Sequence, residues 1–297
     1  MLFRRLFLLF LFIVSFASCF HLITGGFQLR KVRFSLPING EWKTILTEEK
    51  KGEIDAILRQ KFFYLGKGRQ SFVFTSEDGN YVLKLFRYHL VKPKFFLHLL
   101  RFVPFWDEYR RYRIASKRMQ LENWMKSYKI AYDYLQKETG ILFVHLTKTK
   151  DFPENIKIYD PLGREYLLDI NEYGFLLQKK TELFHDVIKR LVKEKKKEAL
   201  TILLSHYLDT IFSRHFKGVN NKDPSWLRNF GSIGYKEVYE IDVGRYTFAP
   251  SSQDREVLSL YLHRYIKTLL SLFEMEYPEM ADILQNLVDE KIASCDF

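Results

Sequence analysis

A glycine-containing loop between two apolar runs is the first stretch of the sequence that could do chemistry. Residues 66–71 read Gly-Lys-Gly-Arg-Gln-Ser, and the next four, Phe-Val-Phe-Thr over 72–75, have the composition of a strand. A dinucleotide-binding fingerprint needs a helix at that point, so this loop does not fit that class. Glycines between two strands allow a backbone to close over nucleotide phosphates, although an ordinary hairpin turn has the same composition. The candidate phosphate-contacting residues are Gly66, Lys67, Gly68 and Ser71.

A lysine in the third predicted strand adds a positive charge to this region. Lys84 lies between two leucines in the apolar run 81–86. An unpaired ammonium group is costly to bury, so this lysine needs either a path to water or an anionic partner. A nucleotide phosphate together with a helix carboxylate would be such an anionic partner. The candidate carboxylates in the predicted helix over 107–138 are Glu122, which is preferred, and Glu108. The alternative is a lysine that points away from the core, since alternate strand residues face opposite ways.

These strands resemble the first three strands of the protein-kinase fold. The matching residues are Leu-Gly-Lys-Gly-Arg-Gln-Ser-Phe-Val-Phe over 65–74 and Tyr-Val-Leu-Lys-Leu-Phe over 81–86. In that family a glycine-rich loop, a following valine and a strand lysine hold ATP. The resemblance implies that Val73 contacts adenine, that Lys84 contacts the phosphates, and that the backbone of 175–180 forms the hinge that reads adenine.

The second half of the sequence resembles the metal-binding part of the same family. Asp242-Val-Gly matches the family's Asp-Phe-Gly turn with valine in place of phenylalanine. The resemblance implies that Asn229 and Asp242 bind Mg²⁺, which prefers oxygen ligands and takes few of them from protein. It also implies that Asp223 is the base for an attacking hydroxyl, although Asn-Asn-Lys over 220–222 replaces the usual His-Arg and six positions separate Asp223 from Asn229. The short stretch after Asp242 fits the reduced, atypical members of the family.

The order of the predicted elements divides the chain into two parts. Strands are predicted over 61–65, 72–75, 81–86, 141–147, 156–159, 166–170 and 175–178, and helical periodicity prevails from 181 onward. We therefore expect an α+β, bilobal fold, with a small antiparallel β lobe that carries one long helix and a reduced helical lobe. The expected domains are a signal or anchor over 1–19, an extension over 20–59, an N-terminal lobe over 60–180 and a C-terminal lobe over 181–297.

The N-terminus has the layout of an export signal. Arg4 and Arg5 precede the dense apolar run 6–14, and small residues follow it. This layout is typical of a secretory signal peptide, and an uncleaved membrane anchor is the alternative. The residues before Cys19 resemble a loose lipobox, which would make Cys19 a lipidated residue. We expect export or attachment to the cell envelope. The alternative is a kinase-like domain that faces the cytoplasm.

Two other stretches combine charge with apolar residues. The segment 92–106 is rich in lysine, phenylalanine and leucine, and it either packs on the small lobe, which is the more common case, or lies at a membrane interface. The run 189–197 is strongly charged, which usually marks a solvated helix face and less often a surface for an anionic lipid or substrate.

Composition and charge limit the classes of function. The chain has 297 residues, 47% of them hydrophobic, and a net charge of +11, which suits anionic partners. Its two cysteines are too few for a disulfide framework or a zinc site. The leading hypothesis is a kinase-like protein that uses ATP and Mg²⁺ to phosphorylate a hydroxyl of an unknown protein or small molecule. The alternatives are a pseudokinase that acts as an envelope scaffold, and a secreted basic-aromatic protein that binds membrane or, less expected, nucleic acid.

Overall fold

The chain forms two compact units. The computed structural model describes residues 2–33, 40–95, 97, 104–223, 225–249 and 255–294. The sheet unit comprises Met1–Leu121 and Phe143–Gln178, and the helical unit comprises Glu122–Leu142 and Lys179–Phe297. The long helix α5 (Asp107–Tyr134) contributes its first half to the sheet unit and its second half to the helical unit.

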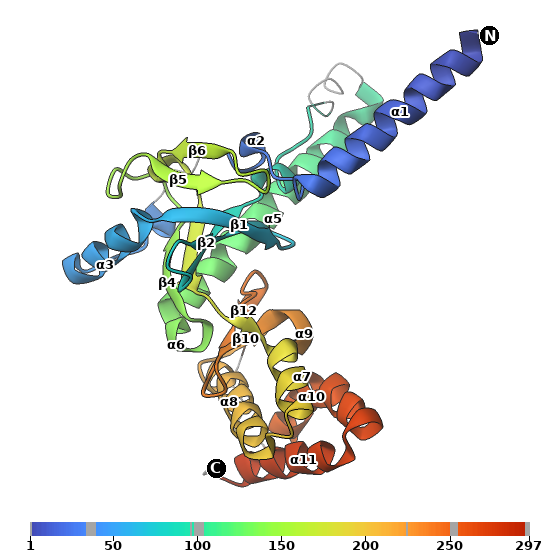
Figure 1. Cartoon of the computed structure of the whole chain (residues 1–297). Helices are drawn as coiled ribbons and strands as arrows, with labels where there is room; N and C mark the ends of the chain where they lie inside the picture. The colour runs from blue at the N-terminus through green and yellow to red at the C-terminus, as the bar shows by residue number, and fades with distance from the viewer. Residues whose placement is uncertain are drawn as a thin grey trace. The chain divides into compact units, whose positions relative to one another are not determined.

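The sheet unit is built on seven strands in the order β4-β7-β3-β2-β1-β5-β6 (Figure 1). The strands are β1 (Lys61–Lys67), β2 (Ser71–Ser76), β3 (Tyr81–Phe86), β4 (Ile141–His145), β5 (Ile156–Tyr159), β6 (Glu165–Leu168) and β7 (Phe175–Lys179). Each begins within one residue of its prediction, because runs of aromatic and branched residues between turn residues are a strong strand signal. The 3₁₀ helices η2 (Tyr88–Leu90), η4 (Pro104–Trp106) and η5 (Ile170–Glu172) lie in the connections.

The sheet is mixed. Antiparallel pairs join β1 to β2, β2 to β3 and β5 to β6, as expected. The pair of β1 and β5 is parallel, with Phe62 opposite Ile158. Parallel neighbours need a long crossover connection, which the chain between these two strands supplies. The expected antiparallel lobe therefore contains one parallel pair that the local sequence could not indicate.

The hairpin between β2 and β3 follows from its turn residues. Gly79 has a φ of +75°, a conformation that glycine adopts without steric cost. The Asp78 Oδ1 accepts hydrogen bonds from the Ser76 hydroxyl at 2.6 Å and from the Asn80 amide at 2.9 Å. These turn residues account for the hairpin that joins the two predicted strands.

Three helices precede the sheet. They are α1 (Leu2–Ile23), α2 (Leu29–Val32) and α3 (Glu48–Leu58), with the 3₁₀ helix η1 (Gly40–Trp42) before α3. In α1 the 18-residue window Phe3–Phe20 has a mean hydropathy of 1.9, and none of it is buried. By length and composition this helix could cross a membrane, and signal sequences share these properties. Cys19 is an exposed free thiol, and both its lipidation and the signal over 1–19 stay predictions.

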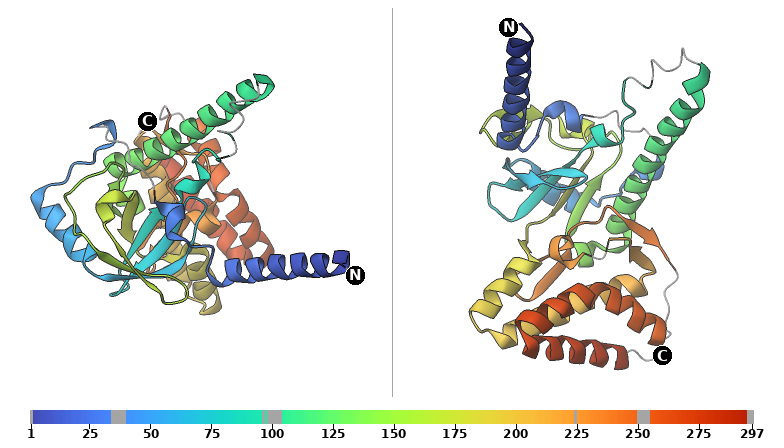
Figure 2. Two further views of the ribbon diagram at one scale, coloured as in Figure 1. Left: turned by 90° about the horizontal axis from the view of Figure 1, so that it is seen from above. Right: turned by 90° about the vertical axis from the view of Figure 1, so that its right-hand side faces the viewer.

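The helical unit packs its helices around one apolar core. Its elements are α6 (Gln136–Thr139), β8 (Glu182–Leu183), α7 (Phe184–Lys193), α8 (Lys197–Phe216), β9 (Val219–Asn221), α9 (Trp226–Asn229), β10 (Phe230–Ile233), β11 (Glu237–Glu240), β12 (Tyr246–Phe248), α10 (Arg255–Glu276) and α11 (Pro278–Ala293). Leucines at helical spacing fill the core, including Leu203, Leu208, Leu262 and Leu284 at 0% exposure. Helices α10 and α11 lie side by side (Figure 2). Its short strands form the sheets β11-β10-β8 and β12-β9.

The expected α+β class is confirmed, with a β-sheet unit and a mostly helical unit. Near residue 180 the composition changes from strands to helices, and the second unit resumes at Lys179. The sequence did not indicate that the segment Glu122–Leu142 belongs to the helical unit, because helical periodicity in α5 is continuous through Leu121 and Glu122.

Candidate functional site

In the sheet unit, Gly66, Val73 and Lys84 form a row across three neighbouring strands. Gly66 of β1 is opposite Val73 of β2, which is in turn opposite Lys84 of β3. Residues directly opposite one another point to the same face of a sheet. The flanking side chains on the other face are fully buried, namely Phe72, Phe74, Leu83 and Leu85. Lys84 therefore lies on the face away from this buried layer, and it is half-buried.

The loop between β1 and β2 is a tight turn that Arg87 holds from beyond β3. The Gly68 amide donates to the Ser71 carbonyl at 2.9 Å. The Arg87 Nη1 donates to the carbonyls of Gly68 at 2.9 Å and Arg69 at 3.3 Å, and its guanidinium lies 5.1 Å from the centre of the Phe72 ring. Burial lowers the pKa of Arg87 from its usual value, yet an arginine stays protonated at neutral pH. The carbonyls of the loop thus face the charged Arg87 side chain. The sequence did not suggest that Arg87 holds this loop.

Gly66→Ala is expected to weaken nucleotide binding without destabilising the fold. A Cβ added to Gly66 meets no atom within 4 Å, and the backbone there is not left-handed. Since glycine in a strand costs about 0.5–1 kcal/mol relative to alanine, the free energy of unfolding should stay level or rise. The methyl group would fill space that a phosphate needs, so Mg·ATP affinity should fall in calorimetric titrations. Gly52→Ala on α3, where an added Cβ is equally unobstructed, is the control. Unchanged affinity in Gly66→Ala would contradict the phosphate-loop interpretation.

The two carboxylates considered as partners of Lys84 both lie at exposed positions of α5. Glu108 belongs to the sheet unit and Glu122 to the helical unit. The pairing of Lys84 with Glu122 stays a prediction.

In the helical unit, two strand pairs bring Asp223, Asn229 and Asp242 together. The β10–β11 pair places Asn229 and Asp242 at the same end of a hairpin, where the Asn229 carbonyl accepts from the Ile241 amide at 2.6 Å and the Asp242 amide at 3.4 Å. The Asn229 Nδ2 donates to the Asp223 carbonyl at 2.8 Å. The β9–β12 pair leads into the Asp223 loop and out of the Asp242 turn at one shared end. Three residues separated by up to 19 positions thus converge in one unit.

The two carboxylates of this cluster can be reached from solvent. Asp242 is exposed, and its Oδ1 accepts a long hydrogen bond of 3.4 Å from the Gly244 amide. The Asp223 carboxylate is 36% exposed and lies 3.9 Å from the Arg245 Nη1. Asn229 is 3% exposed, so its amide is part of the packed loop.

These residues fit a magnesium ion in the type of donor they offer. Asp242 presents an open carboxylate, and the Asn229 side chain adds an amide oxygen whose NH₂ end is fixed by Asp223. Mg²⁺ binds hard oxygens and keeps several non-protein ligands, so two protein donors are sufficient. Within the described residues no group of three or more His, Cys, Asp or Glu side chains could hold a metal ion, so a tight cation site made by protein alone is not found there.

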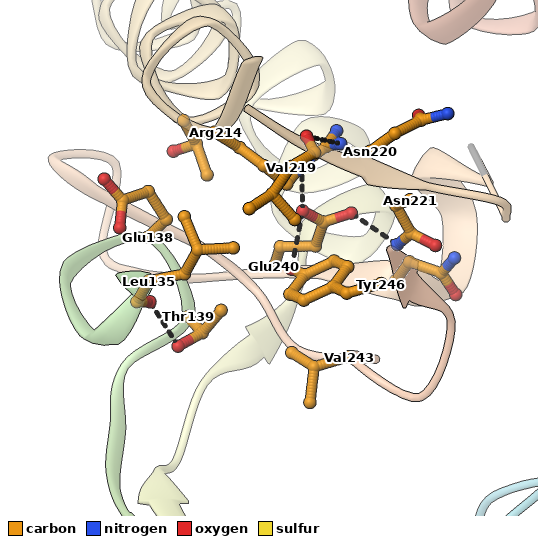
Figure 3. A network of polar contacts seen from close by, with 12 residues as sticks. Leu135, Glu138, Thr139, Arg214, Val219, Asn220, Asn221, Glu240, Val243 and Tyr246 are labelled. Atoms are coloured by element: carbon orange, nitrogen blue, oxygen red, sulfur yellow. Dashed lines mark hydrogen bonds and ion pairs between the residues drawn. The ribbon is translucent and has the colours of Figure 1, made fainter. Parts of the chain in front are cut away.

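Asn221 links the two halves of this cluster. Its side chain is 0% exposed, and its Nδ2 donates to the Glu240 Oε1 at 2.7 Å and, at the limit of 3.5 Å, to the Asp242 carbonyl. Its Oδ1 accepts from the Asp223 amide at 2.9 Å. The backbones of both candidate aspartates are therefore tied to one amide. Figure 3 shows the Asn221 side chain beside the Glu240 carboxylate, with a dashed line that marks their hydrogen bond.

Arg214 and Glu240 form a fully buried ion pair beneath Asn221. Both side chains are 0% exposed, and the Arg214 Nε lies 2.7 Å from the Glu240 Oε2, although its N–H is not aligned for a hydrogen bond. The Tyr246 hydroxyl donates to the same Oε2 at 2.8 Å, and the Arg214 Nη1 donates to the Tyr261 hydroxyl at 2.7 Å. The Arg214 guanidinium lies 4.8 Å from the centre of the Tyr265 ring.

The charge states within this network follow from burial and from the ion pair. Burial lowers the pKa of Arg214, but attraction by Glu240 and by the tyrosine oxygens outweighs it and raises the pKa above its usual value. Burial also raises the pKa of Tyr246 well above its usual value, and the nearby Glu240 carboxylate raises it further. Arg214 therefore stays charged and Tyr246 stays a neutral donor at physiological pH.

Ser127 of α5 fixes the turn that follows Asp242. Its hydroxyl is buried, accepts from the Tyr246 amide at 2.6 Å and donates to the Val243 carbonyl. This serine lies 116 positions before Val243 in the chain. The helix thus holds the backbone of this turn at Val243 and Tyr246.

The structure brings together the residues predicted for each unit and adds four that the sequence did not indicate. In the sheet unit the row of Gly66, Val73 and Lys84 is assembled, and in the helical unit the cluster of Asp223, Asn229 and Asp242 is assembled. The missed residues that support the cluster are Asn221, Arg214, Glu240 and Ser127. The local sequence offered little signal for them, since a basic residue in the last turn of α8 and a glutamate at the end of β11 are both ordinary.

Comparisons with known proteins find weak structural likeness. No protein family matches the chain, and no curated protein does. Among solved structures, the chain is similar to the bifunctional kinase-methyltransferase WbdD, with 17% identity and a TM-score of 0.37 in one structure and 18% and 0.33 in another. The match covers 77% of this chain and 44% of WbdD. The complex of Rv3197 with erythromycin from Mycobacterium tuberculosis matches with 13% identity and a TM-score of 0.36, over 96% of this chain and 81% of that one.

Proposed function

We propose that the chain is a kinase-like protein that binds Mg·ATP and transfers a phosphoryl group to a hydroxyl. The observation that supports this most is the cluster in the helical unit, where the open Asp242 carboxylate and Asn229 lie next to the Asp223 loop. The row of Gly66, Val73 and Lys84 in the sheet unit supports it independently.

In the sheet unit the roles follow from position and charge. The half-buried Lys84 ammonium would attract the phosphates, and Val73 beside it would contact adenine with its apolar side chain. The backbone of β7 and the residues after it would read the adenine edge. The amide groups of the loop at Gly66 and Gly68 would approach the phosphates, because no side chain stands above Gly66.

In the helical unit the proposed roles are to bind the metal and accept a proton. Asp242 and Asn229 would hold Mg²⁺, which when bound neutralises charge on the transferred group. The Asp223 carboxylate would accept the proton of the attacking hydroxyl, and its 36% exposure leaves it open to an acceptor. Asn221 would keep the two aspartates in register through its three hydrogen bonds.

A binding protein without transfer activity is the second candidate. Asn229 is 3% exposed and uses its NH₂ group to hold the loop, which is what a purely structural asparagine would do. Such a pseudokinase would bind nucleotide and present its surface to a partner at the envelope.

The direct test is titration of the chain with Mg·ATP. Lys84→Met is expected to weaken binding by about ten- to a hundredfold, because a hydrogen bond to a charged group contributes about 1.5–3 kcal/mol and each 1.4 kcal/mol is tenfold. Lys157→Met on β5, which removes an exposed strand lysine of the same unit, is the control and should bind normally. A wild-type chain that does not bind Mg·ATP would remove both candidates.

A further inference from the structure

The 3₁₀ helix η4 and the first half of α5 expose an unusual number of aromatic and other apolar side chains. Phe105 is 88% exposed, Trp106 46%, Tyr109 43%, Tyr112 68% and Met119 60%. The rings touch one another rather than a core, with the centre of Trp106 5.9 Å from that of Tyr109. Figure 2 shows this part of α5, drawn in green, extending beyond the strands of the sheet unit. Contiguous apolar exposure of this kind usually marks a surface that meets a partner or a membrane.

The exposed apolar side chains form a stripe along one face of the helix. Tyr109, Tyr112 and Met119 are three and seven positions apart, so they lie on the same side of an α-helix. At 100° per residue, Arg113 falls on one side of that stripe. On the other side falls Arg111, whose side chain is 70% exposed, beyond the exposed Glu108, while Arg118 lies on the opposite face of the helix from Tyr109.

Charge on this segment is predominantly positive. Residues 105–119 contain five basic and two acidic side chains. One of the two, Asp107, is already paired, with Arg110 at 2.7 Å and with Arg111 at 3.2 Å. Arg113 and Arg118 are exposed, and the Arg113 guanidinium lies 5.9 Å from the Tyr109 ring. An apolar stripe with arginines on both sides is the pattern of a helix that lies in a lipid headgroup layer.

We propose that the face formed by Trp106 and the first half of α5, comprising Trp106, Tyr109, Arg111, Tyr112, Arg113 and Met119, lies on an anionic lipid surface. The rings enter the headgroup layer, and the flanking arginines contact lipid phosphates on both sides. A lipid surface fits better than a protein partner because the apolar stripe is narrow and has arginines at both edges beside a single glutamate, Glu108. The same unit also carries the apolar helix α1, whose window Phe3–Phe20 is not buried. The inference does not depend on nucleotide binding.

Trp106 allows a direct test in the full chain. The other three tryptophans, Trp42, Trp124 and Trp226, are 7%, 8% and 3% exposed, so lipid contact should affect the emission of Trp106 alone. The chain is reconstituted in phosphatidylcholine vesicles with or without one quarter phosphatidylglycerol, using lipids brominated near the headgroup as quenchers. The difference in emission between wild type and Trp106→Phe is the signal of Trp106. In the anionic vesicles, brominated lipid is expected to quench most of this signal.

Charge reversal separates this surface from the effect of α1. Arg111→Glu/Arg113→Glu is expected to abolish the quenching of Trp106 while the chain stays with the vesicles. Lys43→Glu/Arg59→Glu, which changes the net charge equally at exposed positions of the same unit, should leave it intact. Quenching of Trp106 that is absent in wild type, or equal with and without phosphatidylglycerol, would overturn the proposal. The proposal would also be overturned if the emission of Trp106 changed with protein concentration and not with brominated lipid. That result would mean that a second copy of this chain, and not lipid, covers this face.

Discussion

Asp242→Ala is expected to reduce phosphoryl transfer by about 100- to 1000-fold while leaving the helical unit folded. Loss of one preorganised electrostatic contact to a developing charge typically costs about that factor, and a metal ligand acts on the same charge. The measurement is release of labelled phosphate from Mg·ATP labelled at the γ position, with water as the acceptor, so that no natural acceptor is needed.

The reason to expect normal folding lies in how Asp242 is held. Its amide donates to the Asn229 carbonyl at 3.4 Å, and its carbonyl accepts from Asn221 at 3.5 Å, and both contacts belong to the backbone. The carboxylate makes one long contact, 3.4 Å to the Gly244 amide, and is exposed. Removing it should therefore change the free energy of unfolding by no more than about 0.5 kcal/mol, as for other surface positions.

The matched control is Asp282→Ala, which removes an exposed carboxylate of α11 in the same unit. It should leave phosphate release unchanged. Transfer by wild type that persists in Asp242→Ala would refute the metal-binding role of Asp242. A wild type that binds Mg·ATP but releases no phosphate would support the pseudokinase alternative.

The strands and helices could be predicted closely because their signals are local. The run Tyr81–Phe86 follows a glycine turn and consists of apolar and aromatic residues around one lysine, and it forms β3 at the predicted residues. Gly140, which follows the predicted helix over 107–138, adopts the left-handed conformation that ends α6. The parallel pairing of β1 with β5 could not be predicted, because it depends on where a connection of many residues returns to the sheet.

The candidate site could be predicted only in part, for the same reason. Asp242 and Asn229 were indicated by a motif resemblance, and the β10–β11 hairpin places them together. Asn221 had no signal, because an asparagine before a loop is ordinary in sequence and becomes informative only when its partners Glu240 and Asp242 are known. Arg214 reads as a basic residue in the last turn of α8, a favourable position that needs no partner, and so its burial was not expected.

Arg214→Met should be the most destabilising single change in this network. Removing one partner of a buried ion pair leaves the other charge uncompensated and typically costs about 3–5 kcal/mol. Glu240 would keep two neutral donors, Asn221 at 2.7 Å and Tyr246 at 2.8 Å, but no cation. Urea unfolding followed by tryptophan emission measures the loss, since Trp226 is buried in the core of the helical unit. Arg264→Met, at an exposed position of α10, is the control and should change the free energy of unfolding by no more than about 0.5 kcal/mol.

The double variant Arg214→Met/Glu240→Gln separates the ion pair from simple loss of packing. Glutamine keeps an oxygen that can accept from Asn221, and its NH₂ group can donate to the Tyr246 hydroxyl, so no charge is left buried. A neutral, well-packed replacement for a buried ion pair is often as stable as the pair itself. We therefore expect the double variant to recover at least half of the stability lost in Arg214→Met. A double variant as unstable as the single one would mean that Arg214 acts through its packing against Tyr265, whose ring lies 4.8 Å away, and not through Glu240. Recovery of stability would mean that Arg214 acts by neutralising Glu240. Glu240 in turn holds Asn221, which bonds to the backbones of the two candidate aspartates.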